Sequence, residues 1–344
     1  MNKYTTKTIN FRYYLEGLCQ KFAQNGYMVS LLSRDDSLAG IHGTVVTSFL
    51  NLEKSTESID GIGSYIKSHK DNFYIIYNLD KPKHVSQIRH IERKVLFMVF
   101  TEKYFFVDNQ VDQINKRKKI KKYFFFTYRK FRFITMSSSS ESFLRSIGIH
   151  NVSCIKPGFE IKSETSGSKS NIPSIYYDLT NDYKGSELVI LSLRLIVKAF
   201  PHTKLFINGN GNIPDKILEL AEIKKVKDNI EFLPSLLSKE REALISASWI
   251  NMNTSLGNDL ELSILEATFL GTPTIGYDVP GVSDLIASGD NGFKVESYFV
   301  SAYAEAAIEI MKNYARYSIS TLNYAKHFHW DKVIDEWEDA LNFP

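Results

Sequence analysis

A lysine followed by a glycine stands between an expected strand and a long expected helix. Lys184 is that lysine, in the run YYDLTNDYKGSELVILSL (residues 176–193). An ammonium group at the amino end of a helix adds to the positive helix end, and together they can hold a phosphate. The alternative is a solvated lysine at an ordinary helix start. On its own the lysine leaves both interpretations open.

Two glycines follow a second expected strand, in the run LFINGNG (residues 205–211). Gly209 and Gly211 would let the backbone approach a ligand or adopt a left-handed conformation. Asn-Gly is also a common turn, so the glycines mark a strand end more firmly than a binding site.

The longest informative segment covers residues 253–295, from NTSLGNDLELSILEATF to DNGFKV. We expect a strand, a polar loop and then a helix that begins near Leu260. A helix start suits a diphosphate, and Glu266, one to two turns further on, suits a ribose diol. The alternative is an exposed helical glutamate, although the apolar neighbours Leu265 and Ala267 place it near a packed surface.

These segments belong to a regular alternation of strands and helices, which predicts an α/β fold with doubly wound parallel sheets. We expect a first Rossmann-like domain over residues 1–160 and a polar linker over residues 161–172. A second domain is expected over residues 173–325, and residues 326–344 should form a helix that returns to the first domain. Ligands of such folds bind at the carboxyl ends of the strands, in the cleft between the domains.

Composition narrows the function classes. The 344 residues are 43% hydrophobic and 24% charged, with a net charge of +3, so the whole molecule is not an obvious polyanion binder. Two cysteines, Cys19 and Cys154, lack metal-ligand spacing and predict reduced thiols, no bound metal and no disulfide framework. With no long apolar run and no signal-peptide pattern, we expect a cytoplasmic protein.

As a set, these segments resemble family 4 glycosyltransferases, which are retaining enzymes of the GT-B fold with two Rossmann-like domains facing across a cleft. The resemblance covers most of residues 130–340. It rests on KGSELVILSLRLI, LFINGNG, LEATFLGTPTIGYDVPGVSDLI, HFHWDKVIDEW and, before the linker, SIGIHNVSCIKPGFE. It implies a nucleotide-diphosphate sugar as co-substrate, a saccharide or lipid-linked saccharide as acceptor, and no cofactor or metal.

The resemblance also implies roles for individual residues. Glu266 matches the second glutamate of the family's paired-glutamate motif and would bind the ribose, while Asn258, in place of the first, would face the sugar. The residues implied in donor binding are Lys184, Gly209, Gly211, Leu233, Asp259, Leu262, Ser263 and Glu266.

Several positions depart from the family pattern. Asn258 carries no charge, and the carboxylates of Asp259 and Glu261 would either stabilise the helix start or repel a diphosphate held there. Asp178 stands where the family has an arginine that pairs with the lysine. The strand that opens the family's first domain is expected to be reduced or missing here. A catalytically weakened homologue that binds sugars or a glycosyltransferase partner is therefore the second hypothesis.

Residues 116–133, KRKKIKKYFFFTYRKFRF, mix basic and aromatic side chains. Such a mixture suits an anionic membrane surface, with charge for the headgroups and rings for the interface. Alternatively, the aromatic residues form a buried strand beside a solvated basic loop, or the segment binds nucleic acid. The expected membrane-surface patch consists of Lys118, Lys119, Lys121, Lys122, Phe125 and Arg129, which would place the protein peripherally on the inner face of the membrane.

Overall fold

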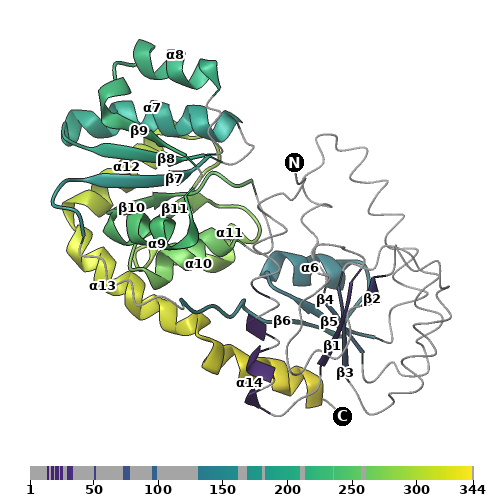
Figure 1. Ribbon diagram of the computed structural model, residues 1–344. Coiled ribbons are helices and arrows are strands. Elements are labelled where there is room, and N and C mark those ends of the chain that lie inside the picture. The colour runs from purple at the N-terminus through teal and green to yellow at the C-terminus, as the bar shows by residue number, and fades with distance from the viewer. Residues whose placement is uncertain are drawn as a thin grey trace. The chain divides into compact units, whose positions relative to one another are not determined.

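The chain divides into two compact units, which are labelled by their elements in Figure 1. Unit 1 combines residues 1–159 with residues 328–344, and unit 2 is the continuous stretch 160–327. The computed structural model describes residues 14, 17–18, 20–22, 24–25, 29–33, 50–51, 73–77, 95–98, 131–161, 169–179, 183–209, 214–234, 236–256 and 261–342.

Unit 1 contains a sheet in the order β2-β1-β3-β4-β5-β6, in which every pair of neighbours is parallel. Its strands are β1 (Val29–Ser33), β2 (Leu50–Asn51), β3 (Phe73–Tyr77), β4 (Val95–Met98), β5 (Arg132–Thr135) and β6 (Val152–Cys154). Helix α6 (Ser138–Ser146) connects the last two strands, and α14 (Trp330–Asn342) is contributed by the carboxyl end of the chain.

Unit 2 contains a second parallel sheet, in the order β12-β11-β10-β7-β8-β9. The strands are β7 (Ser174–Asp178), β8 (Lys204–Asn208), β9 (Ile230–Leu233), β10 (Ile250–Met252), β11 (Thr274–Tyr277) and β12 (Gly292–Val295). From β7 the strands run outward in chain order to β8 and β9 on one side, and from β10 to β11 and β12 on the other. The strand order therefore reverses between β7 and β10. In open α/β sheets, that reversal is where ligands bind.

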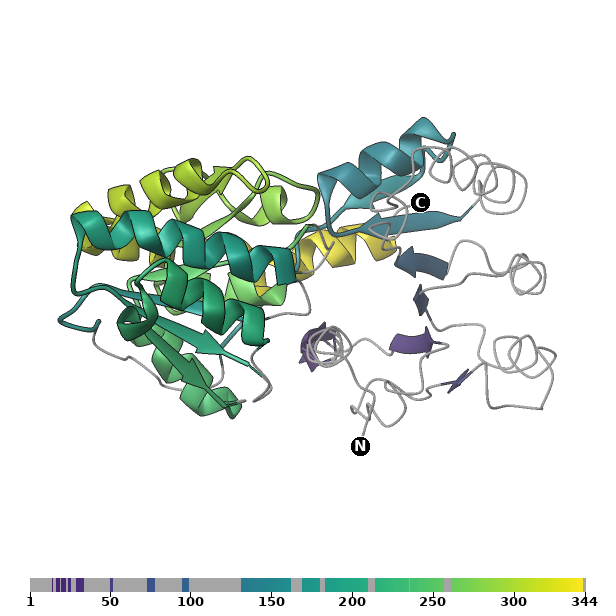
Figure 2. The ribbon, with the colours of Figure 1, turned by 90° about the horizontal axis from the view of Figure 1, so that it is seen from above.

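Helices cover both faces of this sheet (Figures 1 and 2). One face is covered by α7 (Tyr183–Ala199), α8 (Asp215–Ile223) and α12 (Val300–Lys312), with α7 and α12 side by side. The other is covered by α9 (Ser238–Ala247), α10 (Leu262–Phe269) and α11 (Val282–Leu285), with α13 (Tyr314–Ala325) against α10. Short 3-10 turns, η4 (Lys227–Asn229) and η5 (Lys326–Phe328), precede β9 and α14.

Burial on both faces explains the strand sequences. Within β7, Ile175 and Tyr177 lie in the core beneath α7 and α12, whereas Tyr176 packs with residues of α9 and α10. A strand covered on both faces reads as a continuous apolar run rather than an alternating one, as SIYY does.

The predicted fold class is confirmed, because both units are α/β with parallel sheets. The strands and helices expected between residues 131 and 287 are present, although α10 begins at Leu262 rather than near Leu260. Strand β12 and helices α12 and α13 were not predicted individually. Of the described helices, none has the length and apolar composition needed to cross a bilayer.

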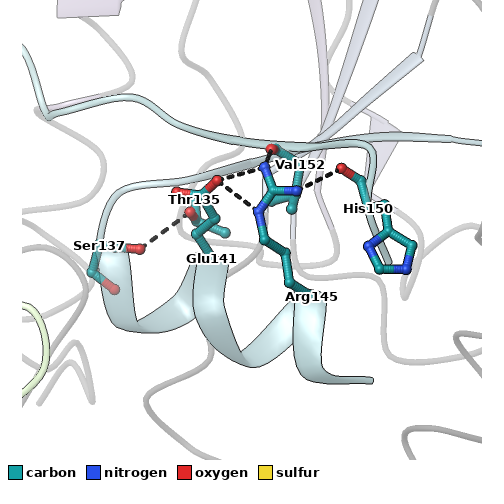
Figure 3. A network of polar contacts seen from close by, with 6 residues as sticks. All are labelled: Thr135, Ser137, Glu141, Arg145, His150 and Val152. Carbon is teal, nitrogen blue, oxygen red and sulfur yellow. Dashed lines mark hydrogen bonds and ion pairs between the residues drawn. The ribbon is translucent and has the colours of Figure 1, made fainter. Parts of the chain in front are cut away.

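Helix α6 is held between β5 and β6 by polar contacts at both of its ends (Figure 3). The Ser137 hydroxyl accepts a hydrogen bond from the Ser140 amide at 3.1 Å and so caps the amino end of the helix. Arg145 pairs with Glu141 at 2.7 Å and donates to the carbonyls of His150 and Val152 (Figure 3). One guanidinium therefore ties the last turn of the helix to the start of β6.

The core of unit 1 joins residues from opposite ends of the chain. The Tyr14 and Trp330 rings lie 5.3 Å apart, and Phe22 meets Trp337 edge-on at 6.1 Å. All four side chains are buried. Gly158 fits against the Trp330 ring so closely that an added Cβ would lie 2.2 Å from it.

Phe131 corrects one expectation about the basic and aromatic segment. The membrane interpretation of residues 116–133 would place this ring at an interface, but the ring is buried, as is that of Phe133. Arg132 between them donates to the Ala340 carbonyl at 2.5 Å. Residues 131–133 therefore follow the buried-strand alternative, because β5 lies inside the sheet. The six residues of the expected patch lie outside the described residues.

Lys169, in the segment expected to be the linker, is fixed to unit 2. Its ammonium donates to the Ser248 carbonyl at 2.8 Å and to the Thr272 hydroxyl at 2.7 Å. Burial lowers the pKa of Lys169 to about 7, because the charged form is poorly solvated there. Residues 162–168 lie outside the described part of the chain.

The Gly158–Trp330 contact yields a stability prediction. Gly158→Ala should lower the free energy of unfolding by about 1–3 kcal/mol, because the new methyl group overlaps the indole. Urea denaturation followed by fluorescence measures this change. In a Trp330→Leu background the same substitution should cost much less, since the overlap is removed. An equal cost in both backgrounds would contradict the account.

Candidate functional site

The candidate site lies at the carboxyl edge of the unit 2 sheet, where β7, β8 and β10 end and α10 begins. Because parallel strands end on one edge, residues distant in the sequence meet there. Asp178 ends β7 and Asn208 ends β8, while Asn253 and Ser255 follow β10. Behind this edge lies Glu266, the fifth residue of α10.

Glu266 forms an ion pair with Arg241, which helix α9 contributes. Arg241 Nη2 lies 2.8 Å from Glu266 Oε1. The glutamate side chain is 8% exposed and that of the arginine 26%. A carboxylate this buried requires a cation or several donors, because water no longer solvates it. None of the described residues donates a hydrogen bond to Oε2 of Glu266.

Burial also decides how readily Glu266 ionises. Desolvation, with a smaller contribution from the nearby carboxylates of Asp178 and Glu242, raises the pKa of Glu266, and Arg241 opposes them; the net pKa is about 7. Glu266 therefore changes its charge near neutral pH. For Arg241, burial lowers the pKa, but Glu266 and Asp178 together more than offset this and the pKa is raised, so the arginine is charged.

A second cluster forms the neighbouring wall of the site. Asp178 Oδ1 accepts a hydrogen bond from the Tyr176 hydroxyl at 2.6 Å and another from Asn208 Nδ2 at 2.7 Å. The Asn208 side-chain oxygen accepts from the Leu236 amide at 3.2 Å. Burial, followed by the charge of Asp178, raises the pKa of Tyr176, so its hydroxyl stays neutral and acts as a donor. The strand ends of β7 and β8 are thereby locked together.

The loop after β10 is held to the start of α10. Asn253 donates to the Ser263 hydroxyl at 3.3 Å and accepts from the Ser255 amide at 3.0 Å. The Ser255 hydroxyl donates to Glu261 at 2.5 Å, so this carboxylate stabilises the loop. The Tyr303 hydroxyl donates to the Asn253 carbonyl.

The amino end of α7 is tied to the same edge. The Tyr177 hydroxyl lies 3.2 Å from that of Ser186 and 3.0 Å from that of Thr254. Lys184 is the second residue of α7, as the sequence predicted. Its side chain lies outside what the structure describes.

The other predicted donor-binding residues fall at different places on this edge. Gly209 is buried directly after β8, and its amide donates to the Leu233 carbonyl at the end of β9 at 3.3 Å. Leu262 and Ser263 form the first turn of α10. Gly211, Asn258 and Asp259 lie outside the described residues. A role in donor binding stays a prediction for all of them, as it does for Glu266.

Arg241 was missed by sequence reasoning. It lies in the polar stretch SKEREALISA, where it looks like an ordinary exposed helix residue. The sequence signal for it was indirect. Glu266 stands between Leu265 and Ala267, and a glutamate buried among apolar residues needs a cationic partner. Within the described residues, no three His, Cys, Asp or Glu side chains gather as a metal site would require.

Residues 160–327 match the family described as glycosyl transferases group 1. Unit 2 is a group 1 glycosyltransferase domain. The match has the same limits as unit 2, which spans Glu160–His327. The predicted resemblance to family 4 glycosyltransferases is thereby confirmed for the domain that carries the candidate site.

Individual relatives of this domain support the assignment. A poly(glycerol-phosphate) alpha-glucosyltransferase of Bacillus subtilis is 29% identical over 157 residues, or 44% of this chain and 23% of that protein. A poly(ribitol-phosphate) alpha-N-acetylglucosaminyltransferase of Staphylococcus aureus is 25% identical over 46% of this chain and 33% of its own length. The chain thus spans at most about half the length of the curated relatives it matches first.

Solved structures extend the likeness to the whole fold. A glycosyltransferase from Rickettsia africae has a TM-score of 0.72 at 13% identity, covering 97% of this chain and 95% of its own. The pneumococcal O-GlcNAc transferase GtfA, solved with UDP and GlcNAc, has a TM-score of 0.61 at 17% identity, covering 81% and 59%. At these identities the comparison establishes the GT-B fold of the group 1 enzymes and nothing finer.

The buried Glu266 predicts an unusual pH dependence of stability. Its pKa is about 7 in the folded protein against an ordinary value of 4.5, so the folded state holds a proton between these values that the unfolded state has lost. The free energy of unfolding should therefore fall as pH rises from 4.5 to 7. This change is on the order of 3 kcal/mol and levels off above pH 7.

Glu266→Gln cannot titrate and should flatten this dependence in denaturant unfolding measured at several pH values. Glu222→Gln is the matched control, because Glu222 forms a pair that is exposed on both sides. Parallel curves for the wild-type protein and Glu266→Gln would show that Glu266 does not carry the effect.

Proposed function

We propose that the protein transfers a sugar, with retention of anomeric configuration, from a nucleotide-diphosphate sugar to a saccharide or lipid-linked saccharide. The observation that carries the proposal is Glu266. It is a buried carboxylate behind the carboxyl edge of the sheet, in a domain of the group 1 glycosyltransferase family, and one of its oxygens has no described donor. A ribose diol supplies hydroxyl donors that a carboxylate can accept.

In this proposal the diphosphate lies between the starts of two helices. Lys184 and the amides of Leu262 and Ser263 bind it, because a helix start carries free N–H groups and a partial positive charge. The Ile264 amide already donates to the Glu261 carbonyl at 3.0 Å. Lysine, amides and helix dipoles replace a metal ion.

The remaining predicted residues take positions around the sugar and the nucleotide. Asn258 faces the sugar, where its amide can hydrogen-bond hydroxyl groups. Gly209, whose amide donates to Leu233, lets the backbone come close to the nucleotide, and we assign the same role to Gly211. Asp259 disfavours the diphosphate by charge repulsion and so weakens donor binding.

For the acceptor we propose a surface polysaccharide or glycoconjugate. The names of two relatives specify poly(glycerol-phosphate) and poly(ribitol-phosphate), and these polymers are the first acceptors to try. A lipid-linked saccharide is the alternative acceptor, which the basic segment 116–133 would suit by binding near anionic headgroups.

Donor binding is tested with a panel of UDP- and GDP-sugars, by calorimetry and by nucleotide release with membrane extract as acceptor. Glu266→Ala should weaken donor binding at least tenfold, because a charge-assisted hydrogen bond is worth about 1.5–3 kcal/mol. Asp259→Ala should strengthen it. Glu222→Ala is the control for loss of an exposed carboxylate. Unchanged dissociation constants in both test variants would refute this arrangement.

The same assay separates an enzyme from a catalytically weakened homologue. Asp178, in place of the family's arginine, and Asn258, in place of its first glutamate, favour the second possibility. Donor binding without nucleotide release, with every acceptor tried, would identify a binding subunit. Absence of binding to any nucleotide sugar would exclude both.

Membrane attachment is a separate proposal and has its own test. Liposome flotation should show binding to anionic vesicles that weakens as salt rises. Replacing Lys118, Lys119, Lys121 and Lys122 with glutamine should abolish it, since each basic residue contributes about 1 kcal/mol at such a surface. Equal flotation with neutral vesicles would contradict the electrostatic account. Binding to single-stranded nucleic acid instead would favour the other alternative.

A further inference from the structure

Two carboxylates meet at the candidate site, and a single guanidinium faces both. Glu266 and Asp178 each interact electrostatically with Arg241. Asp178 already accepts two neutral hydrogen bonds, from Tyr176 and Asn208. Glu266 has no such neutral donors among the described residues, and its stabilising contact is the 2.8 Å pair with Arg241. The ion pair with Arg241 is therefore the described contact that stabilises the charge of Glu266.

The geometry of the pair leaves half of the carboxylate free. Arg241 contacts Oε1 through Nη2 alone, so Oε2 has no described donor. Arg241 is on α9 and Glu266 on α10, two helices that pack together on one face of the sheet. Pinning one oxygen from the neighbouring helix restricts the rotation of the carboxylate and thereby sets the direction of the other oxygen.

We propose that Arg241 is a positioning residue for donor binding, which keeps Glu266 ionised and directs its free oxygen toward the ribose hydroxyls. The inference rests on the proposed function, because it assigns Glu266 a nucleotide sugar as ligand. Arg241 itself acts through Glu266 and need not touch the donor.

The charges around Glu266 determine how donor binding depends on pH if Arg241 has this positioning role. From β7, Asp178 opposes ionisation of Glu266, and from α9, Glu242 opposes it too, while Arg241 favours it. Tyr176 is neutral, because its pKa is raised. Ionised Glu266 accepts from ribose hydroxyls, so donor binding should tighten as pH rises through about 7, the pKa of this carboxyl. Without the guanidinium, the two neighbouring carboxylates remain and the midpoint must move to higher pH.

The test measures binding of UDP-glucose and GDP-mannose by calorimetry between pH 5.5 and 9. Nucleotide sugars are used because the terminal phosphate of a free nucleoside diphosphate titrates near pH 6 and would mask the transition. Arg241→Met should raise the binding midpoint by about 1–3 pH units, the usual effect of an adjacent opposite charge on a carboxyl. Arg241→Lys should keep the midpoint near that of the wild-type protein.

Lys227→Met is the matched control, because Lys227 also pairs with a glutamate of unit 2 but is exposed. It should leave both affinity and midpoint unchanged. The carboxyl 13C signal of Glu266, assigned with Glu266→Gln, reports the same titration without any ligand, and its midpoint should rise in Arg241→Met.

The possible outcomes separate the two proposals. If Arg241→Met weakens binding equally at every pH with an unmoved midpoint, the arginine is merely structural and this inference fails, while the proposed function stands. If the wild-type protein binds neither sugar nucleotide at any pH, the proposed function fails and this inference fails with it. A midpoint that rises in Arg241→Met and returns in Arg241→Lys supports the positioning role.

Discussion

Parallel strand pairing is the constraint from which the rest of this structure follows. Every neighbouring pair in both sheets is parallel, and in unit 2 the connections cross the faces of the sheet so that helices cover both of them. The central strands of unit 2 are therefore buried on both sides, as the apolar run of β7 is. The same pairing brings the ends of β7, β8 and β10 to one edge, where polar residues can gather without interrupting the core.

That edge holds more negative charge than a diphosphate site would lead one to expect. The structure accommodates it in two ways. Asp178 accepts hydrogen bonds from two neutral donors, Tyr176 on its own strand and Asn208 on the adjacent strand, whereas Glu266 relies on a guanidinium from another helix. Glu266 therefore depends on a single residue for the stabilisation of its charge. Glu266, the carboxylate proposed to bind the ribose, is thus ionised only above about pH 7 and only with the help of Arg241.

The sequence was sufficient for the fold and for part of the site. The alternation of strands and helices predicted the α/β class correctly, and Lys184 and Glu266 lie on helices as expected. The pairing of Arg241 with Glu266 was out of reach, because it joins residues 25 positions apart through the packing of α9 on α10. The burial of Phe131 could not be decided from the sequence for a related reason, because an aromatic residue beside basic residues gives the same pattern whether it faces a membrane or a sheet interior.

The composition of unit 1 has a consequence for how the protein is made. Its core contains Tyr14 and Phe22 from the start of the chain and Trp330 and Trp337 from the end. Unit 2, by contrast, is one uninterrupted stretch. During synthesis, unit 2 has all of its residues before Trp330 leaves the ribosome, so the domain encoded second can complete its core first. The usual order of folding from the amino end is thereby reversed, and until α14 is synthesised the partners of Trp330 and Trp337 stay uncovered.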